Sequence, residues 1–178
     1  MIKSDHEFCP PPYFPSPGQT AQCGVESSFA EAASLALARM REPMLYPPTA
    51  LDAASGIYRL MCLPSFGSPY CVRVQRTEGT RIAVYKETNG TGGYDPGHLA
   101  RESTVELSVD QWQRFEEVLD KQYFWSTPLR GLPGGLDGEE WIAEGARANA
   151  YRAIYRWGGG TADAILRGLC AIAPDIGR

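Results

Sequence analysis

The fold is decided by one continuous stretch, IYRLMCLPSFGSPYCVRVQRTEGTRIAVYKE, which covers residues 57–87. Short turns that contain Gly, Pro or Thr divide it into three runs, 57–63, 70–76 and 81–87. In the second and third runs apolar and polar residues alternate, which is typical of strands with one packed face and one wet face. We therefore expect an antiparallel meander, and the STVEL run at 103–107 predicts its fourth strand.

A final hairpin is predicted by the runs EEWIAEG at 139–145 and AYRAIYRW at 150–157. Its register depends on the length of the turn. A two-residue turn would leave Arg152 opposite Gly145, whereas a three-residue turn would place opposite charges across from each other. Those pairs would be Glu144–Arg152 and Glu140–Arg156. Because each such pair contributes roughly 0.2–1 kcal/mol, we expect the three-residue turn.

Three helices are expected, at 27–42, 108–122 and 162–172. The middle helix begins with a capping-box pattern, in which a Ser is followed three residues later by a Gln. The candidate N-cap residues are Ser27 or Ser28, Ser108, and Thr161.

Runs of strands separated by helices indicate an α+β fold. We expect an antiparallel meander sheet plus a C-terminal hairpin, covered on one face by two or three helices. The five prolines of FCPPPYFPSPG at 8–18 exclude a helix or a central strand there. Residues 1–26 are therefore predicted to form a Pro-rich arm, and residues 27–178 a single domain.

Composition excludes several classes of protein. The chain has 178 residues, 43% hydrophobic and 21% charged, which is typical of one folded domain. Its net charge is −4, from 17 basic and 21 acidic side chains, so we expect no nucleic-acid partner. No apolar run approaches the ~20 residues of a membrane span, and residues 1–9 contain no apolar segment typical of a secretion signal. Residues 91–178 carry the whole acidic excess.

Two interpretations of the five cysteines stay open. Cys62 and Cys71 flank a turn, and Cys9 and Cys23 flank a Pro-rich stretch, so two local disulfides would indicate a periplasmic protein. Reduced, partly buried cysteines would instead indicate a cytoplasmic one. No C-x-x-C pair occurs and the chain has only two histidines, so we expect no zinc site and no cofactor.

Cys23 also raises the hypothesis of a thiol hydrolase. It precedes the first predicted helix, whose dipole favours a thiolate, and a Gln a few residues upstream could donate to an oxyanion. This arrangement is similar to papain-like thiol hydrolases, and His98 would then act as the base. The sequence departs from the papain pattern because no Cys-x-aromatic motif follows. A buried or disulfide-bonded Cys23 is the alternative interpretation.

Two other groups of residues are candidates for a site. The Gly-rich loop at 88–98 is long for a connection between strands, and such loops often carry binding function. Its candidate contact residues are Tyr94, Asp95 and His98. The second group contains the closely spaced carboxylates Asp137, Glu139, Glu140 and Glu144. They could form a glycosidase pair or hold a metal, but cross-strand pairing with arginines explains them without catalysis, so we expect no metal site.

Residues 57–172 resemble a widespread class of small bacterial proteins of unassigned function. The resemblance is carried by the segments YRLMCLPSF, GGYDPGHL, LDGEEWIAEG and YRAIYRW. It implies a bacterial origin and one α+β unit, and it brings no catalytic residues with it.

Three hypotheses of function follow. The leading one is a non-enzymatic bacterial binding protein, of the immunity or inhibitor type, that neutralises a toxin or enzyme partner. It is favoured because no convincing catalytic set is present and because acidic surfaces accelerate the capture of basic partners. The alternatives are the thiol hydrolase and an envelope-associated structural module. The residues expected to bind the protein partner are Tyr94, Asp95, His98, Glu116, Glu117 and Asp120.

Overall fold

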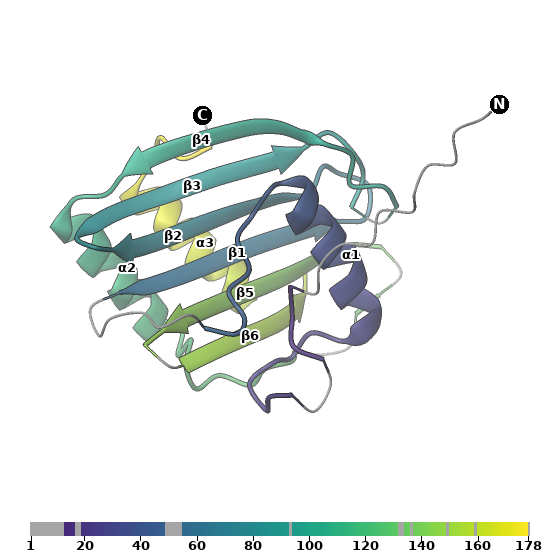
Figure 1. The fold of residues 1–178 in the computed structure, drawn as a ribbon, viewed down its shortest axis with the longest axis horizontal. Coiled ribbons are helices and arrows are strands. Elements are labelled where there is room, and N and C mark those ends of the chain that lie inside the picture. Colours follow the sequence, from purple (N-terminus) through teal and green to yellow (C-terminus); the bar gives the residue numbers. More distant parts are fainter. Residues whose placement is uncertain are drawn as a thin grey trace.

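The computed structural model describes residues 13–16, 19–48, 55–92, 94–131, 134–135, 137–148, 150–158 and 160–177. This part of the chain forms the expected α+β fold, with an open six-stranded antiparallel sheet and three helices (Figure 1). The strands are β1 (Gly56–Pro64), β2 (Tyr70–Thr77), β3 (Thr80–Thr88), β4 (Leu99–Glu106), β5 (Glu139–Arg147) and β6 (Ala150–Trp157). The helices are α1 (Ser27–Arg39), α2 (Val109–Lys121) and α3 (Thr161–Ile172).

The strand order is β4-β3-β2-β1-β5-β6. The first four strands form the predicted meander, and the final hairpin returns to pair with β1. The β1–β5 pairing places Arg59 opposite Glu144, although these residues are 85 positions apart. This long-range pairing brings the two halves of the chain into one sheet.

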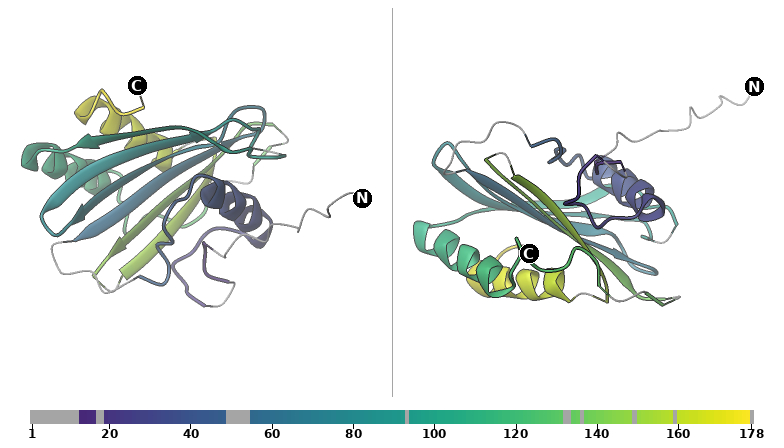
Figure 2. Two further views of the ribbon diagram at one scale, coloured as in Figure 1. Left: turned by 45° about the horizontal axis from the view of Figure 1, so that its top comes forward. Right: turned by 90° about the horizontal axis from the view of Figure 1, so that it is seen from below.

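Helices lie on both faces of the sheet, so the expectation of one covered face is wrong (Figure 2). α2 and α3 pack on the back face, where a core forms around Tyr58, Trp112 and Phe115. α1 crosses the front face, the one toward the viewer in Figure 1, and packs on a second core with Leu37 and Ile142. Burial of apolar residues on both faces allows β1 and β5 to be almost wholly buried.

Of the predicted helix ends, the start of α2 is confirmed and the end of α1 differs from the prediction. The capping box of α2 is confirmed, because Gln111 N–H donates to Ser108 Oγ and the Gln111 side chain accepts from Ser108 N–H. α1 ends at Arg39 instead of residue 42. Its chain turns through Arg41, which has a φ of 56°, and Glu42 N–H donates to the carbonyl of Leu37. This Schellman turn directs Glu42 toward the sheet.

The other two predicted N-caps are wrong. Glu26 occupies the N-cap position of α1, instead of Ser27 or Ser28. Gly160 occupies that of α3, instead of Thr161. Each of these helices therefore begins at least one residue earlier than the predicted N-cap would allow.

The predicted three-residue turn of the final hairpin is also wrong. Arg147 pairs with Ala150, so only two residues separate the strands, and Arg152 lies opposite Gly145. The back-face core explains this register, because a Cβ atom at position 145 would lie 2.7 Å from the ring of Phe124. Only glycine fits there, and the packing of a whole strand outweighs the small energy of cross-strand charge pairs.

Of the two interpretations of the cysteines, the one with a Cys62–Cys71 disulfide is wrong. Cys62 contributes to the back-face core and Cys71 to the front-face core, so the sheet separates their side chains. In the same interpretation the partner of Cys23 is Cys9, which lies outside the described residues, and Cys23 itself is a free cysteine. Alternating residues of a strand point to opposite faces, which forbids the first bridge.

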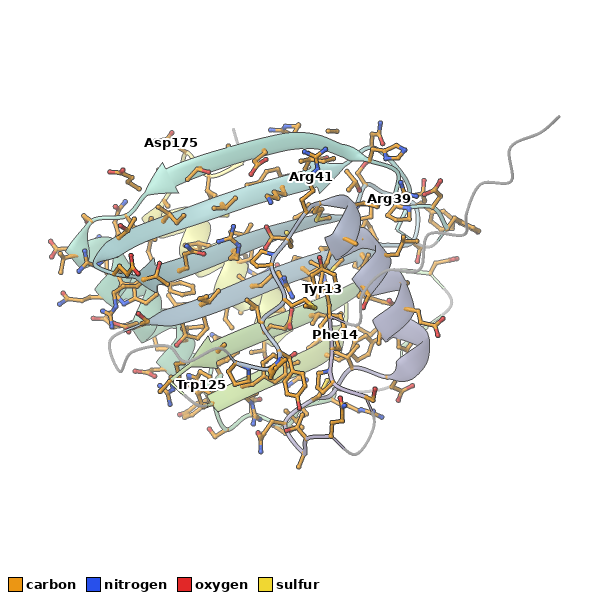
Figure 3. The ribbon with its side chains drawn as sticks, viewed as in Figure 1. Tyr13, Phe14, Arg39, Arg41, Trp125 and Asp175 are labelled. Carbon is orange, nitrogen blue, oxygen red and sulfur yellow. The ribbon has the colours of Figure 1, made fainter. Side chains whose placement is uncertain are left out.

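Parts of the predicted Pro-rich arm pack against the domain. Tyr13 and Phe14 are buried beside α1 on the front of the sheet (Figure 3). The backbone at Cys23 pairs with that of Ala153 in β6 as an isolated β-bridge. The 22–24 segment therefore lies along the outer edge of that strand. Among the described residues, no helix combines the length and apolar character needed to cross a bilayer.

Candidate functional site

A buried ionic cluster holds the end of α1 on the front face of the sheet. We define it as Arg59, Arg73, Lys86, Glu42 and Glu144. Glu42 is fully buried and lies within ion-pair distance of three cations: 2.9 Å from Arg73, 3.1 Å from Lys86 and 3.8 Å from Arg59. Since buried charges are costly unless paired, this geometry fixes where the chain leaves α1.

Arg59 is the centre of this cluster and is itself fully buried. Its Nε donates to Glu144 at 2.8 Å, its Nη2 donates to the same carboxylate, and its Nη1 donates to the carbonyl of Pro43 at 2.7 Å. Burial alone lowers the pKa of a guanidinium, but the neighbouring Glu144 and Glu42 outweigh it, so the pKa of Arg59 is raised. Glu144 also accepts from Tyr151 Oη at 2.8 Å. The cluster thus links the chain just after α1 to strands β1, β2, β3 and β5.

Beside this cluster, the β3–β4 loop is held by its own backbone. Asn89 N–H donates to the carbonyl of His98, and Gly90 N–H donates to that of Pro96. A Cβ atom at Gly90 would lie 2.1 Å from the carbonyl oxygen of Asp95, so this close approach requires glycine. His98 N–H also donates to the Asn89 side chain at 2.9 Å. The described part of the loop is therefore well connected by hydrogen bonds.

The β1–β2 and β3–β4 loops meet at one end of the sheet. Gly92 N–H donates to the carbonyl of Gly67 at 3.0 Å, and Thr88 N–H donates to that of Pro69 at 3.0 Å. The two loops carry Phe66 and Tyr94, which are 71% and 78% exposed. Arg39, at the end of α1 in Figure 3, contacts His98 with 3.2 Å between Nη1 and Nδ1. We call the exposed residues Phe66, Tyr94, Asp95 and His98 the loop surface.

The predicted partner-binding residues fall into two separate groups. Tyr94, Asp95 and His98 belong to the loop surface. The other three lie on α2, on the back face of the sheet: Glu116, Glu117 and Asp120. Of these, Glu117 pairs with Lys121 at 4.0 Å, and Glu116 lies 3.9 Å from Arg76. The structure therefore does not bring the six residues into one surface.

The residues of the thiol hydrolase hypothesis are not brought together either. Cys23 lies against β6 and His98 directly precedes β4, so the two residues are at opposite edges of the sheet. Four strands separate these edges, a distance on the order of 20 Å. Burial raises the pKa of the Cys23 thiol, which opposes formation of a thiolate.

The predicted acidic group is dispersed as well. Glu144 belongs to the ionic cluster, while the Glu139 carboxylate accepts from Trp141 Nε1 at 3.1 Å. Glu140 lies on the front side of β5, and burial raises its pKa from 4.5 to about 7. Within the described ranges, no group of His, Cys, Asp or Glu side chains could hold a metal ion.

Glu140 gives a prediction about the pH dependence of stability. Between pH 4.5 and pH 7 the folded state holds a proton that the unfolded state has lost, so stability falls as pH rises through this window. Screening by solvent limits the loss to about 1–2 kcal/mol. Urea unfolding at pH 4.5 and pH 8 should show that Glu140→Gln removes this loss. Glu106→Gln, at an exposed position of β4, should keep it, and equal pH profiles for the two variants would contradict the assignment.

Sequence reasoning misses two of the residues that shape this region. Arg59 is one charged residue in the otherwise apolar run IYRLMCL, and a charge in a buried strand needs a partner. That signal could have indicated the ionic cluster. Phe66 lies in a short turn, where the sequence gives no sign of its exposure.

The chain was also compared with known proteins. No family model matches it, and no curated protein matches it. Its site is therefore interpreted from geometry alone.

Proposed function

We propose that this chain is a non-enzymatic binding protein that recognises a protein partner through the loop surface. The observation that carries the proposal is the exposure of Phe66 and Tyr94 on two loops that are joined by backbone hydrogen bonds. Aromatic side chains are the residues that most often dominate binding energy at protein interfaces. Loops already held in place lose little entropy on binding.

The favoured form of this function is that of an immunity or inhibitor-type protein. Such a protein needs a rigid recognition surface and no chemistry of its own. The exposed Asp95 beside Tyr94, together with a net charge of −4, favours a basic partner by electrostatic steering. The acidic residues of α2 would add to the long-range field without touching the same partner surface.

The proposal is tested by identifying and then measuring a partner. Immobilised protein is used to retain a partner from a lysate of the native cell, and the purified partner is then titrated by calorimetry. The double variant Phe66→Ala/Tyr94→Ala is expected to lose at least about 2 kcal/mol of binding free energy, roughly a 30-fold increase in Kd. If the partner is a toxin or enzyme, an equimolar amount of wild-type protein should suppress its activity.

A matched control is available just after α2, which ends at Lys121. Tyr123 is 71% exposed, so Tyr123→Ala removes the same kind of side chain outside the loop surface. It should leave Kd unchanged within about twofold. A partner that binds the double variant as tightly as the wild type, or that loses affinity only with Tyr123→Ala, would show that the loop surface is not the recognition site.

A further inference from the structure

Two arginines on the back side of β6 have no acidic partner among the described residues. Arg152 and Arg156 retain only 7% and 9% exposure. Within the described chain their hydrogen bonds go to neutral oxygens, and the ion pairs found there involve neither residue. The carboxylates expected to pair with them, Glu144 and Glu140, lie on the front side of β5. Two cations are thus desolvated without a counter-charge, which is costly unless an anion joins them.

The two guanidinium groups converge on one residue, Thr127. Nη2 of Arg152 donates to the Thr127 carbonyl, and Nη2 of Arg156 lies 3.4 Å from Thr127 Oγ1. Arg156 also donates to the carbonyl of Pro128 at 2.6 Å. Arg152 Nε is buried and has no hydrogen-bond partner among the described residues. Burial lowers the pKa of both guanidiniums, and the proximity of Arg152 lowers that of Arg156 further.

The start of α3 lies beside the aliphatic part of the Arg156 side chain. A Cβ atom at Gly160, the N-cap residue, would lie 3.5 Å from Cγ and Cδ of Arg156. The first-turn N–H groups of a helix have no acceptor within the helix, and the helix dipole makes this end positive. Asp163 in this turn pairs with Arg167 four residues later, which offsets its charge. The start of α3 therefore adds positive potential beside Arg156.

Two glycines border the Arg156 side chain, which is itself only 9% exposed. Gly131 and Gly160 are both exposed and both lie against the Arg156 side chain. A Cβ atom at Gly131 would lie 2.9 Å from Arg156 Cδ. The nearest carboxylate by register, that of Glu139, accepts from Trp141 instead of an arginine. Positions 131 and 160 therefore add no side chain of their own to the cover of Arg156.

We propose that Arg152, Arg156 and the N-terminus of α3 form a binding site for a dianionic phosphoryl group. Two guanidiniums balance the charge of −1.5 to −2 that a phosphate monoester carries near pH 7. Guanidinium forks and helix N-termini are both suited to phosphate oxygens. A single carboxylate would neutralise only one of the two arginines. The site is independent of the loop surface, because it lies on the other side of the sheet.

Binding is tested with inorganic phosphate at constant ionic strength, followed by ³¹P NMR and by the melting temperature of the protein. The wild type should bind phosphate saturably and melt at a higher temperature as phosphate increases, because a ligand of the folded state stabilises it. Sulfate, which has the same shape, should compete, and chloride should not. A titration with glycerol phosphate separates the two sources: tighter binding than inorganic phosphate identifies a phosphomonoester, and weaker binding identifies the free anion. Absence of saturable phosphate binding to the wild type overturns the proposal.

Variants locate the site. Arg156→Gln and Arg152→Gln should each weaken phosphate binding at least tenfold, whereas Arg114→Gln, at an exposed position of α2, should change it less than twofold. If a Gln variant does not fold, Arg156→Lys keeps the charge but loses the fork, and its phosphate affinity should still fall several-fold. Wild-type affinity in a folded Arg156 variant would place the bound phosphate elsewhere and overturn the assignment.

Discussion

Replacing Glu144 with Gln is expected to lower the free energy of unfolding by about 3–5 kcal/mol. The carboxylate of Glu144 accepts from Nε and Nη2 of Arg59, which is fully buried. Without that charge, the closest remaining carboxylate is Glu42, at 3.8 Å, and Glu42 is already bound to two other cations. An uncompensated guanidinium would then remain inside the protein. Urea unfolding measures the loss, and the melting temperature should fall by about 10 °C.

Two further variants separate the loss of charge from the loss of shape. Glu117→Gln removes the same charge from an exposed ion pair and should cost less than about 0.5 kcal/mol. The double variant Arg59→Met/Glu144→Gln removes both buried charges and should recover most of the stability. Glu42 keeps Arg73 and Lys86 as partners in that variant. If Glu144→Gln alone costs less than about 1 kcal/mol, the buried guanidinium does not depend on this carboxylate.

Local features of the fold could be predicted from the sequence because local interactions determine them. The capping box at Ser108 needs only residues three apart, and the alternation in β2 and β3 needs only neighbours. The meander follows from short turns between consecutive strands. These elements would look the same in many tertiary contexts, so a single sequence is enough to predict them.

Long-range features could not be predicted because they depend on which strands become neighbours. Glu144 meets Arg59 only because β5 pairs with β1. The expected Glu144–Arg152 pair assumed that charges within the hairpin set its register. Cross-strand charge pairs contribute roughly 0.2–1 kcal/mol, whereas a slip by one residue would turn a whole buried strand to the wrong face. The close contact between Gly145 and the ring of Phe124 is one such packing constraint, because it leaves no room for a side chain at position 145.

The same distinction between local and long-range features applies to the candidate site. A long Gly-rich loop indicates exposure, and Tyr94 and Asp95 are exposed as its length suggests. The β1–β2 loop, which carries Phe66, belongs to the loop surface because the β2–β3 pairing brings both loops to one end of the sheet. Alternation along β2 places Cys71 on the same face as Arg73, the face opposite to Cys62, so strand parity argues against the Cys62–Cys71 bridge.

Replacing Phe115 with Ala is expected to cost about 3–5 kcal/mol. Phe115 is fully buried between α2 and the sheet. Its ring lies edge-on to Tyr58, with 5.6 Å between centroids, and 6.0 Å from Trp112. Truncation removes the transfer free energy of the ring and both aromatic contacts, and it leaves a cavity that the surrounding strands cannot fill.

Val109→Ala is the control for this prediction, because Val109 is also in α2 but is 51% exposed. Its cost should stay below about 0.5 kcal/mol. Both variants should keep the wild-type dependence of unfolding free energy on urea, since neither changes how much surface unfolding exposes. A loss at Phe115 comparable to that at Val109 would mean that α2 contributes little to the back-face core. The meander strands, whose loops form the loop surface, pack on the back-face core. Phe115→Ala should therefore also weaken partner binding at the loop surface at temperatures near the lowered melting point of the variant.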